Sequence, residues 1–159
     1  LGGDAPVEIW ERLDDECEDE HLEWHILLAP HHCSRHAMGR KEIKNGTEIF
    51  TWSDSAIAAL DHPLGVRPHV VSSSRKFGSN HPPHPQARDR YNRILALGGE
   101  VTDAVRKRFR ITAGASGEDA EDVVFNFTSK GPTRGVLAAP FVASTPTATG
   151  GGGYGNLRE

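Results

Sequence analysis

Cysteine and long apolar runs are scarce in this sequence, and each scarcity excludes a class of protein. Of the 159 residues two are cysteines, Cys17 and Cys33, which form neither a disulfide framework nor a C-x-x-C zinc site. No segment approaches the run of about 18 apolar residues that a transmembrane helix needs, and no start resembles a signal peptide. Hydrophobic residues make up 36% and the mean hydropathy is −0.50. We therefore expect a cytoplasmic chain with free thiols and no membrane partner.

The length is that of one domain, and the composition divides it unequally. Residues 1–143 alternate between apolar and polar segments, whereas residues 144–159 are rich in Thr, Ala, Pro and then Gly. Such a composition is typical of a flexible linker. We expect a domain over 1–143 and a Gly-rich tail over 144–159. Because the chain begins with Leu, we interpret it as a fragment or a processed chain.

Charge is segregated along the sequence, although the net charge is only −4. Residues 1–23 hold ten acidic side chains against Arg12 alone, and residues 67–110 hold ten basic side chains against three acidic ones. A basic face of this kind can bind phosphates. The alternative is a solvated helix face beside an exposed strand.

Apolar spacing and turn residues predict an alternation of helices and strands. Helices are expected over residues 5–13, 53–60 and 85–97, with Asp4 and Ser53 as caps of the first two. Strands are expected over residues 24–29, 48–52, 68–73 (in the centre of the sheet), 100–102, 108–112 and 122–128, and residues 135–143 are expected to form a last strand or an extended arm. The acidic run 14–20 is expected to be a solvated connector, and Asn45-Gly46 a turn. This order favours mixed α/β layers.

Two adjacent histidines follow the expected strand at 24–29, in the run Pro30-His31-His32-Cys33-Ser34. Loops at strand ends often carry ligands and catalysts, and imidazole with carboxylate is a ligand set for hydrolytic zinc or manganese. Asp4 would lie close by if its strand and the 24–29 strand were neighbours. Ser34 could bond a phosphate oxygen. The alternatives are a helix cap for Asp4, polar loop residues for the histidines and a loop cap for Ser34.

A second polar loop, Gly78-Ser79-Asn80-His81-Pro82-Pro83-His84, follows a strand and opens a helix. Amide groups at a helix start attract anions. Asn80 and His84 could therefore contact a phosphate or a leaving group, with His84 a candidate acid. The alternative is a loop whose prolines only set the start of the helix.

The order of these motifs resembles the C-terminal half of metallo-β-lactamase-fold hydrolases, in particular the competence-protein branch of the ComEC type. The resemblance covers about residues 1–113 and is carried by Gly3-Asp4, the APHHCS run and the GSNHPPHP run. It implies half of an αββα sandwich, a mixed sheet with helices on one face, and two divalent metals, zinc or manganese. Asp4 matches the bridging carboxylate, and either His31 or His32 the last metal-binding histidine. Asn80 and His84 match the substrate-side loop.

The resemblance also has departures. Cys33 stands where the branch has Gly, and Pro83 precedes His84 where Gly is usual. The H-x-H-x-D-H motif, which supplies most of the metal ligands, is absent. Asp4 and one histidine fall below the three protein ligands of a catalytic zinc site, so low metal occupancy is expected in this chain alone.

These observations lead to one main hypothesis and one alternative. The main hypothesis is part of a metal-dependent phosphodiesterase or nuclease that uses a metal-bound hydroxide, with Asp4 and His84 catalytic. Its partners would be the missing N-terminal half of the domain or a partner chain, and DNA or another phosphodiester. The alternative is a non-catalytic module that keeps the fold and binds nucleic acid or docks a protein.

Overall fold

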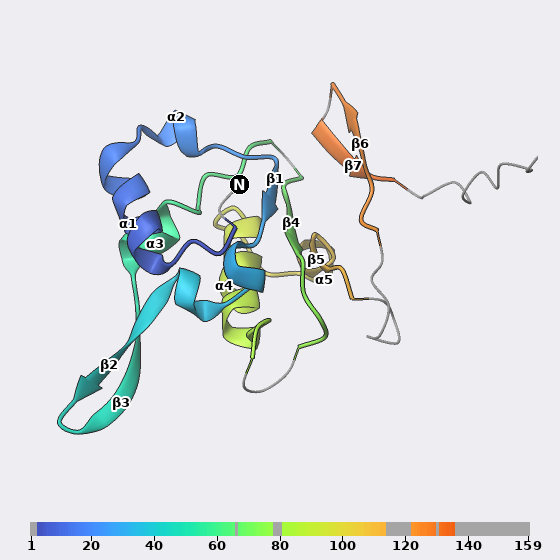
Figure 1. Cartoon of the computed structure of the whole chain (residues 1–159). Coiled ribbons are helices and arrows are strands. Elements are labelled where there is room, and N and C mark those ends of the chain that lie inside the picture. Colours follow the sequence, from blue (N-terminus) through green and yellow to red (C-terminus); the bar gives the residue numbers. More distant parts are fainter. Residues whose placement is uncertain (1–2, 66, 78–80, 114–121, 130, 136–159) are drawn as a thin grey trace, which may run out of the picture.

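A three-stranded parallel sheet forms the centre of the computed structural model, which describes residues 3–65, 67–77, 81–113, 122–129 and 131–135 (Figure 1). Its strands are β1 (Ile26–Leu28), β4 (His69–Ser72) and β5 (Phe109–Ile111), in the order β1-β4-β5. Both pairings are parallel. The sequence prediction that the 68–73 segment is central is confirmed, because β4 pairs on both sides.

Five helices lie in the described part of the chain: α1 (Val7–Glu16), α2 (Asp19–Leu22), α3 (Asp54–Ala58), α4 (Pro85–Leu95) and α5 (Asp103–Arg106). The predicted cap of α3 is confirmed, since Oγ of Ser53 accepts a hydrogen bond from the backbone N–H of Ala56 at 3.2 Å. Pro85 starts α4 at a position where its missing N–H costs nothing.

In the described ranges, antiparallel pairing is confined to two hairpins that are separate from the central sheet. One pairs β2 (Gly39–Lys44) with β3 (Thr47–Trp52) around the predicted Asn45-Gly46 turn, and it projects from the body in Figure 1. The other pairs β6 (Phe125–Thr128) with β7 (Gly131–Arg134). Phe125 packs edge-on against His69 with ring centroids 5.0 Å apart, and this contact joins the second hairpin to β4.

Several local predictions were wrong. Asp4 does not cap α1, because the N-cap is Pro6 and no side chain bonds the helix start. The acidic run 14–20 is not a connector, since α1 continues to Glu16 and α2 follows it. Residues 100–102 form no strand and lead into α5, which Thr102 caps. The expected strand at 135–143, apart from Gly135, and the tail at 144–159 lie outside the described residues.

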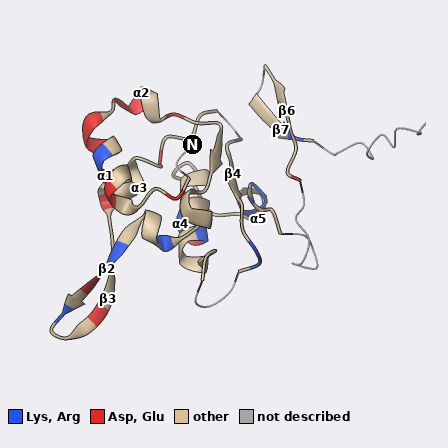
Figure 2. Ribbon diagram, in the orientation of Figure 1, with Lys and Arg blue, Asp and Glu red and all other residues tan. Residues whose placement is uncertain are grey.

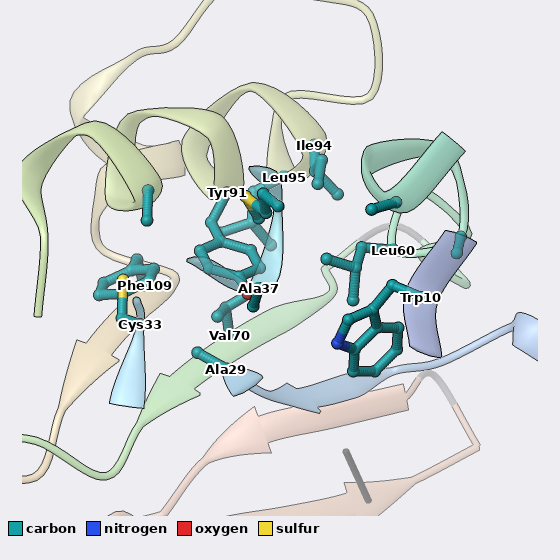
Figure 3. Packing of buried hydrophobic residues seen from close by; sticks show 14 of the residues in the cluster. Trp10, Ala29, Cys33, Ala37, Leu60, Val70, Tyr91, Ile94, Leu95 and Phe109 are labelled. Atoms are coloured by element: carbon teal, nitrogen blue, oxygen red, sulfur yellow. The ribbon is translucent and has the colours of Figure 1, made fainter. Parts of the chain in front are cut away.

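The core lies between α4, the sheet and α1 (Figure 3). Tyr91 and Leu95 of α4 are fully buried against Val70 of β4, and Trp10 of α1 closes the side next to Leu60. The apolar positions of α4 recur at helical spacing, which gives it one buried face. This packing holds the loops that follow β1 and β4 on rigid elements.

The architecture is therefore mixed α/β, with parallel pairing in the central sheet and antiparallel pairing in the two hairpins. Among the described helices, none has the length and apolar character needed to cross a membrane.

Candidate functional site

Asp4 and His32 lie side by side at the carboxyl end of the parallel sheet. Nε2 of His32 is 3.6 Å from Oδ1 of Asp4. The backbone N–H of His31 donates to the carbonyl of Gly3 at 2.7 Å, which fastens the segment before α1 to the loop after β1. The side chain of His32 is 55% exposed and that of Asp4 is 73% exposed, so the pair is open to a ligand. The structure thus brings the predicted carboxylate and one predicted histidine together.

The tautomer of His32 follows from its second contact. Nδ1 of His32 lies within hydrogen-bond distance of the backbone carbonyl of Ser73. A carbonyl only accepts, so Nδ1 carries the proton, and in the neutral ring Nε2 then has a free lone pair. Metal-ligating histidines commonly donate their other ring N–H to a backbone carbonyl in this way. The contact with Ser73 therefore leaves Nε2 as the ring nitrogen that is turned toward Asp4.

The separation of these two atoms fits adjacent ligands of one ion. Two ligands about 2.1 Å from a tetrahedral zinc ion are about 3.4 Å apart, close to the 3.6 Å between Nε2 of His32 and Oδ1 of Asp4. Within the ranges that the structure describes, no group of three His, Cys, Asp or Glu side chains is placed to hold an ion. The separation of Asp4 and His32 is therefore compatible with two adjacent ligands of one ion, and the described residues add no third ligand.

His31 belongs to a different group of side chains. Burial and then Arg35 lower the pKa of His36 and of His84, and the charge of His31 is a smaller cause of both shifts. Nδ1 of His31 is buried and has no hydrogen-bond partner among the described residues. The loop separates the two histidines because His31, His32 and Cys33 all adopt left-handed backbone angles, with φ of 49°, 56° and 62°. Such angles are costly for residues other than glycine, and functional loops often contain them.

Cys33 occupies the position where the resembled branch has glycine, and its backbone is in the conformation that favours glycine. Its side chain is fully buried in the core near Phe109 (Figure 3). Burial raises the pKa of the Cys33 thiol to about 12. A thiol that stays protonated is a poor metal ligand, so Cys33 contributes packing rather than coordination.

The two predicted loops lie against each other. The backbone N–H of His84 donates to the carbonyl of Cys33 at 3.0 Å, and the backbone N–H of Arg35 donates to Nδ1 of His84 at 3.3 Å. Because Nδ1 of His84 accepts, the proton of the neutral ring is on Nε2. His84 is thus a buried N–H donor next to the His31-His32 loop. Asn80 lies outside the described residues.

Ser34 takes the loop-cap role. Its side chain is fully buried, and Oγ accepts a hydrogen bond from the backbone N–H of His36 at 3.2 Å. This bond caps a short turn of 3-10 helix over Arg35–Ala37. The predicted contact between Ser34 and a phosphate stays a prediction, and it would require the buried hydroxyl to become accessible.

Arg35 and His36 are neighbours of the site that sequence reasoning left out. The guanidinium of Arg35 lies 4.6 Å from the ring centroid of Phe50, and the ring of His36 packs edge-on against both Phe50 and His84. Burial, and then the charge of Arg35, lower the pKa of His36 and of His84. A lowered pKa favours neutral rings at pH 7, so His84 is better suited to donate a hydrogen bond than to act as an imidazolium acid.

The stability of the fold is expected to fall as the pH drops below about 6.5. The unfolded chain takes up protons on His36 and His84 near their ordinary pKa of about 6.5. In the fold, burial and then the charges of Arg35 and His31 lower the pKa of both rings. Lys41 further lowers the pKa of His36, which Glu48 opposes, and His81 further lowers that of His84. The unfolded state then binds more protons, and stability is lost until the lower folded pKa values are reached. Urea unfolding at pH 7.5, 6.5 and 5.5 measures this loss. The His36→Gln variant should lose less stability between pH 7.5 and 5.5. A wild-type free energy of unfolding that stays constant or increases toward pH 5.5 would contradict the expectation.

The chain was compared with protein-family models, with curated proteins and with solved structures. None of the three comparisons finds a match.

Proposed function

We propose that this chain is part of a metal-dependent hydrolase that cleaves phosphodiesters, with Asp4 and His32 as two of the ligands of its metal centre. The observation that carries the proposal is the 3.6 Å approach of Nε2 of His32 to Oδ1 of Asp4. Nδ1 of His32 faces the Ser73 carbonyl, so Nε2 is the ring nitrogen turned toward the carboxylate of Asp4. A cation between these two atoms would be bound by both of them.

The resemblance to the competence-protein branch of the metallo-β-lactamase fold gives the remaining parts of this proposal. The fold would be half of an αββα sandwich, and the other ligands would come from an N-terminal half of the same domain or from a partner chain. Two zinc or manganese ions, when bound, would supply Lewis-acid stabilisation and activate water for attack on phosphorus. Two ligands per chain agree with an expected low occupancy in this piece alone.

The chain's own residues have separate roles in this proposal. Asp4 and His32 would bind the cation. The hydrogen bond from the backbone N–H of His31 to the carbonyl of Gly3 keeps the segment before α1 next to the loop after β1. His84, which is fixed by Arg35 through Nδ1, donates from Nε2 to a phosphate oxygen. Arg35 adds a positive charge beside the two loops. Asn80 remains a proposed contact of the substrate on the same loop as His84.

Hydrolysis of a model phosphodiester by the complete protein tests the proposal. Activity is expected with added zinc or manganese, and the Asp4→Ala variant should lose it. Asp54→Ala is a matched control, because Asp54 is an exposed carboxylate at the start of α3, away from the site. Full activity in Asp4→Ala, or equal loss in both variants, would overturn the proposed role of Asp4.

One observation favours a second candidate, a binding module without catalysis: residues 67–110 hold ten basic side chains against three acidic ones. This candidate predicts nucleic-acid binding or protein docking by the complete protein. It also predicts no bound metal, which elemental analysis of the complete protein measures directly.

A further inference from the structure

A group of basic side chains surrounds the edge of β5 that pairs with no described strand, and neither Asp4 nor His32 lies among them. In Figure 2, Lys and Arg gather around β4 and α5, whereas Asp and Glu gather on α1 and α2. Two cavities of about 390 and 500 Å³ lie here and share Arg110 and Arg134 in their walls. We call them together the arginine groove; its basic lining residues are Arg67, Arg88, Arg106, Lys107, Arg108, Arg110 and Arg134.

The positive charges of the arginine groove are poorly neutralised. Asp122 is the one carboxylate among the described residues that line it, and no described lining residue forms an ion pair except Arg88, with Asp89 at 3.9 Å. Because burial and the neighbouring arginines disfavour the charged forms, the pKa values of Arg108 and Arg110 are lowered. Like charges gathered in this way are destabilising unless an anion binds between them.

Buried donors in the arginine groove also lack partners. Nη1 of Arg108 and Nε of Arg110 are buried without a hydrogen-bond partner in the described part of the chain. A buried donor without a hydrogen-bond partner destabilises the fold, because it has lost its bonds to water and gained none in return. A guanidinium group matches the oxygen geometry of phosphate better than an ammonium does. An oxyanion in the groove would satisfy both the charges and these donors.

The shape of the groove favours a ligand whose anionic groups repeat along its length. The two cavities adjoin through Arg110 on β5 and Arg134 on β7, and each is of the size that holds a small-molecule group rather than a duplex. Phe77 lines the first cavity and has the guanidinium of Arg88 over its ring at 4.6 Å, whereas Phe109, which also lines it, is buried in the core. Basic side chains that follow a nucleic-acid backbone are a feature of single-strand binding sites.

We infer that the arginine groove binds single-stranded nucleic acid through successive phosphates. The lining residues of the groove include neither Asp4 nor His32. Binding in the groove therefore needs neither a metal nor the proposed hydrolysis.

Fluorescence anisotropy of a labelled 12-nucleotide oligothymidine with the full chain, in EDTA, tests the inference. We expect binding that weakens with salt, and a loss of about tenfold in affinity for each guanidinium removed in Arg110→Gln/Arg134→Gln. The slope of log K against log salt should fall by about 0.7 for each lost contact. Arg134→Gln alone concerns an exposed side chain and tests the groove even if the double variant misfolds.

A control variant removes two positive charges outside the groove. Lys44→Gln/Arg93→Gln changes exposed side chains on the first hairpin and on α4 that do not line the groove. Wild-type affinity in this control is expected. Equal losses in both double variants, no binding by the wild type, or displacement of the oligonucleotide by tripolyphosphate at equal phosphate concentration would overturn the inference. Because the buffer contains EDTA, none of these results depends on the metal centre.

Discussion

His32→Gln is expected to weaken metal binding by the complete protein by more than about 100-fold, while His31→Gln changes it by less than about tenfold. Loss of an outer partner of a metal ligand costs about ten- to 100-fold, and loss of the ligand itself should cost more. The contrast follows from the geometry, because Nε2 of His32 lies 3.6 Å from Oδ1 of Asp4, whereas no ion pair or hydrogen bond joins the side chain of His31 to Asp4 among the described residues. Isothermal titration with zinc measures both variants.

The pair of variants is its own control, since the two positions are adjacent and both have left-handed backbone angles. Equal effects at the two positions would show that the loop as a whole, rather than Nε2 of His32, matters for binding. A larger effect of His31→Gln would assign the ligand to the other histidine and contradict the geometry.

Tyr91→Ala is expected to lower the free energy of unfolding by about 3–5 kcal/mol, as for other large aromatic residues in cores. Tyr91 is fully buried on α4 and packs against Phe109 of β5, with ring centroids 6.0 Å apart. Removal of the ring leaves a cavity at the centre of the fold. A loss of this size is a large part of the stability of a small domain.

Tyr91→Phe is the matched variant and should have the opposite sign or no effect. The hydroxyl of Tyr91 is buried and has no hydrogen-bond partner among the described residues. Its removal therefore relieves an uncompensated polar group, worth up to about 1 kcal/mol. Urea unfolding of both variants gives the comparison. A destabilisation of Tyr91→Phe by more than about 1 kcal/mol would show that the hydroxyl has a partner.

The elements that the sequence predicted well are those with strong local signals. Val70 and Val71 give β4 its central position, Asn45-Gly46 gives the first hairpin its turn, and Ser53 caps α3. The weaker elements depend on tertiary contacts. β2 has little apolar alternation and exists because it pairs with β3. α5 has four residues, too few for a periodic pattern to show.

The candidate site was predictable in its order along the chain but not in its orientation. That Asp4, the histidine pair and His84 belong together follows from motif order, and the bond from His84 to the Cys33 carbonyl agrees with it. Which histidine faces Asp4 depends on three successive left-handed residues, for which no residue in the loop gives a signal. The 3-10 turn over Arg35–Ala37 and the contact of His36 with Phe50 on the first hairpin place Arg35 and His36 beside the site. A linear sequence motif does not contain such tertiary contacts.

The measurement that tests the central claim most directly is a zinc titration of the ¹⁵N-histidine-labelled complete protein, followed by nuclear magnetic resonance of the ring nitrogens. If Asp4 and His32 form two positions of a metal centre, Nε2 of His32 should shift on zinc binding while its Nδ1 proton stays in place. In Asp4→Asn the shift should require much more zinc. Shifts confined to other histidines, or a His32 ring that is protonated on both nitrogens and indifferent to zinc, would contradict the claim.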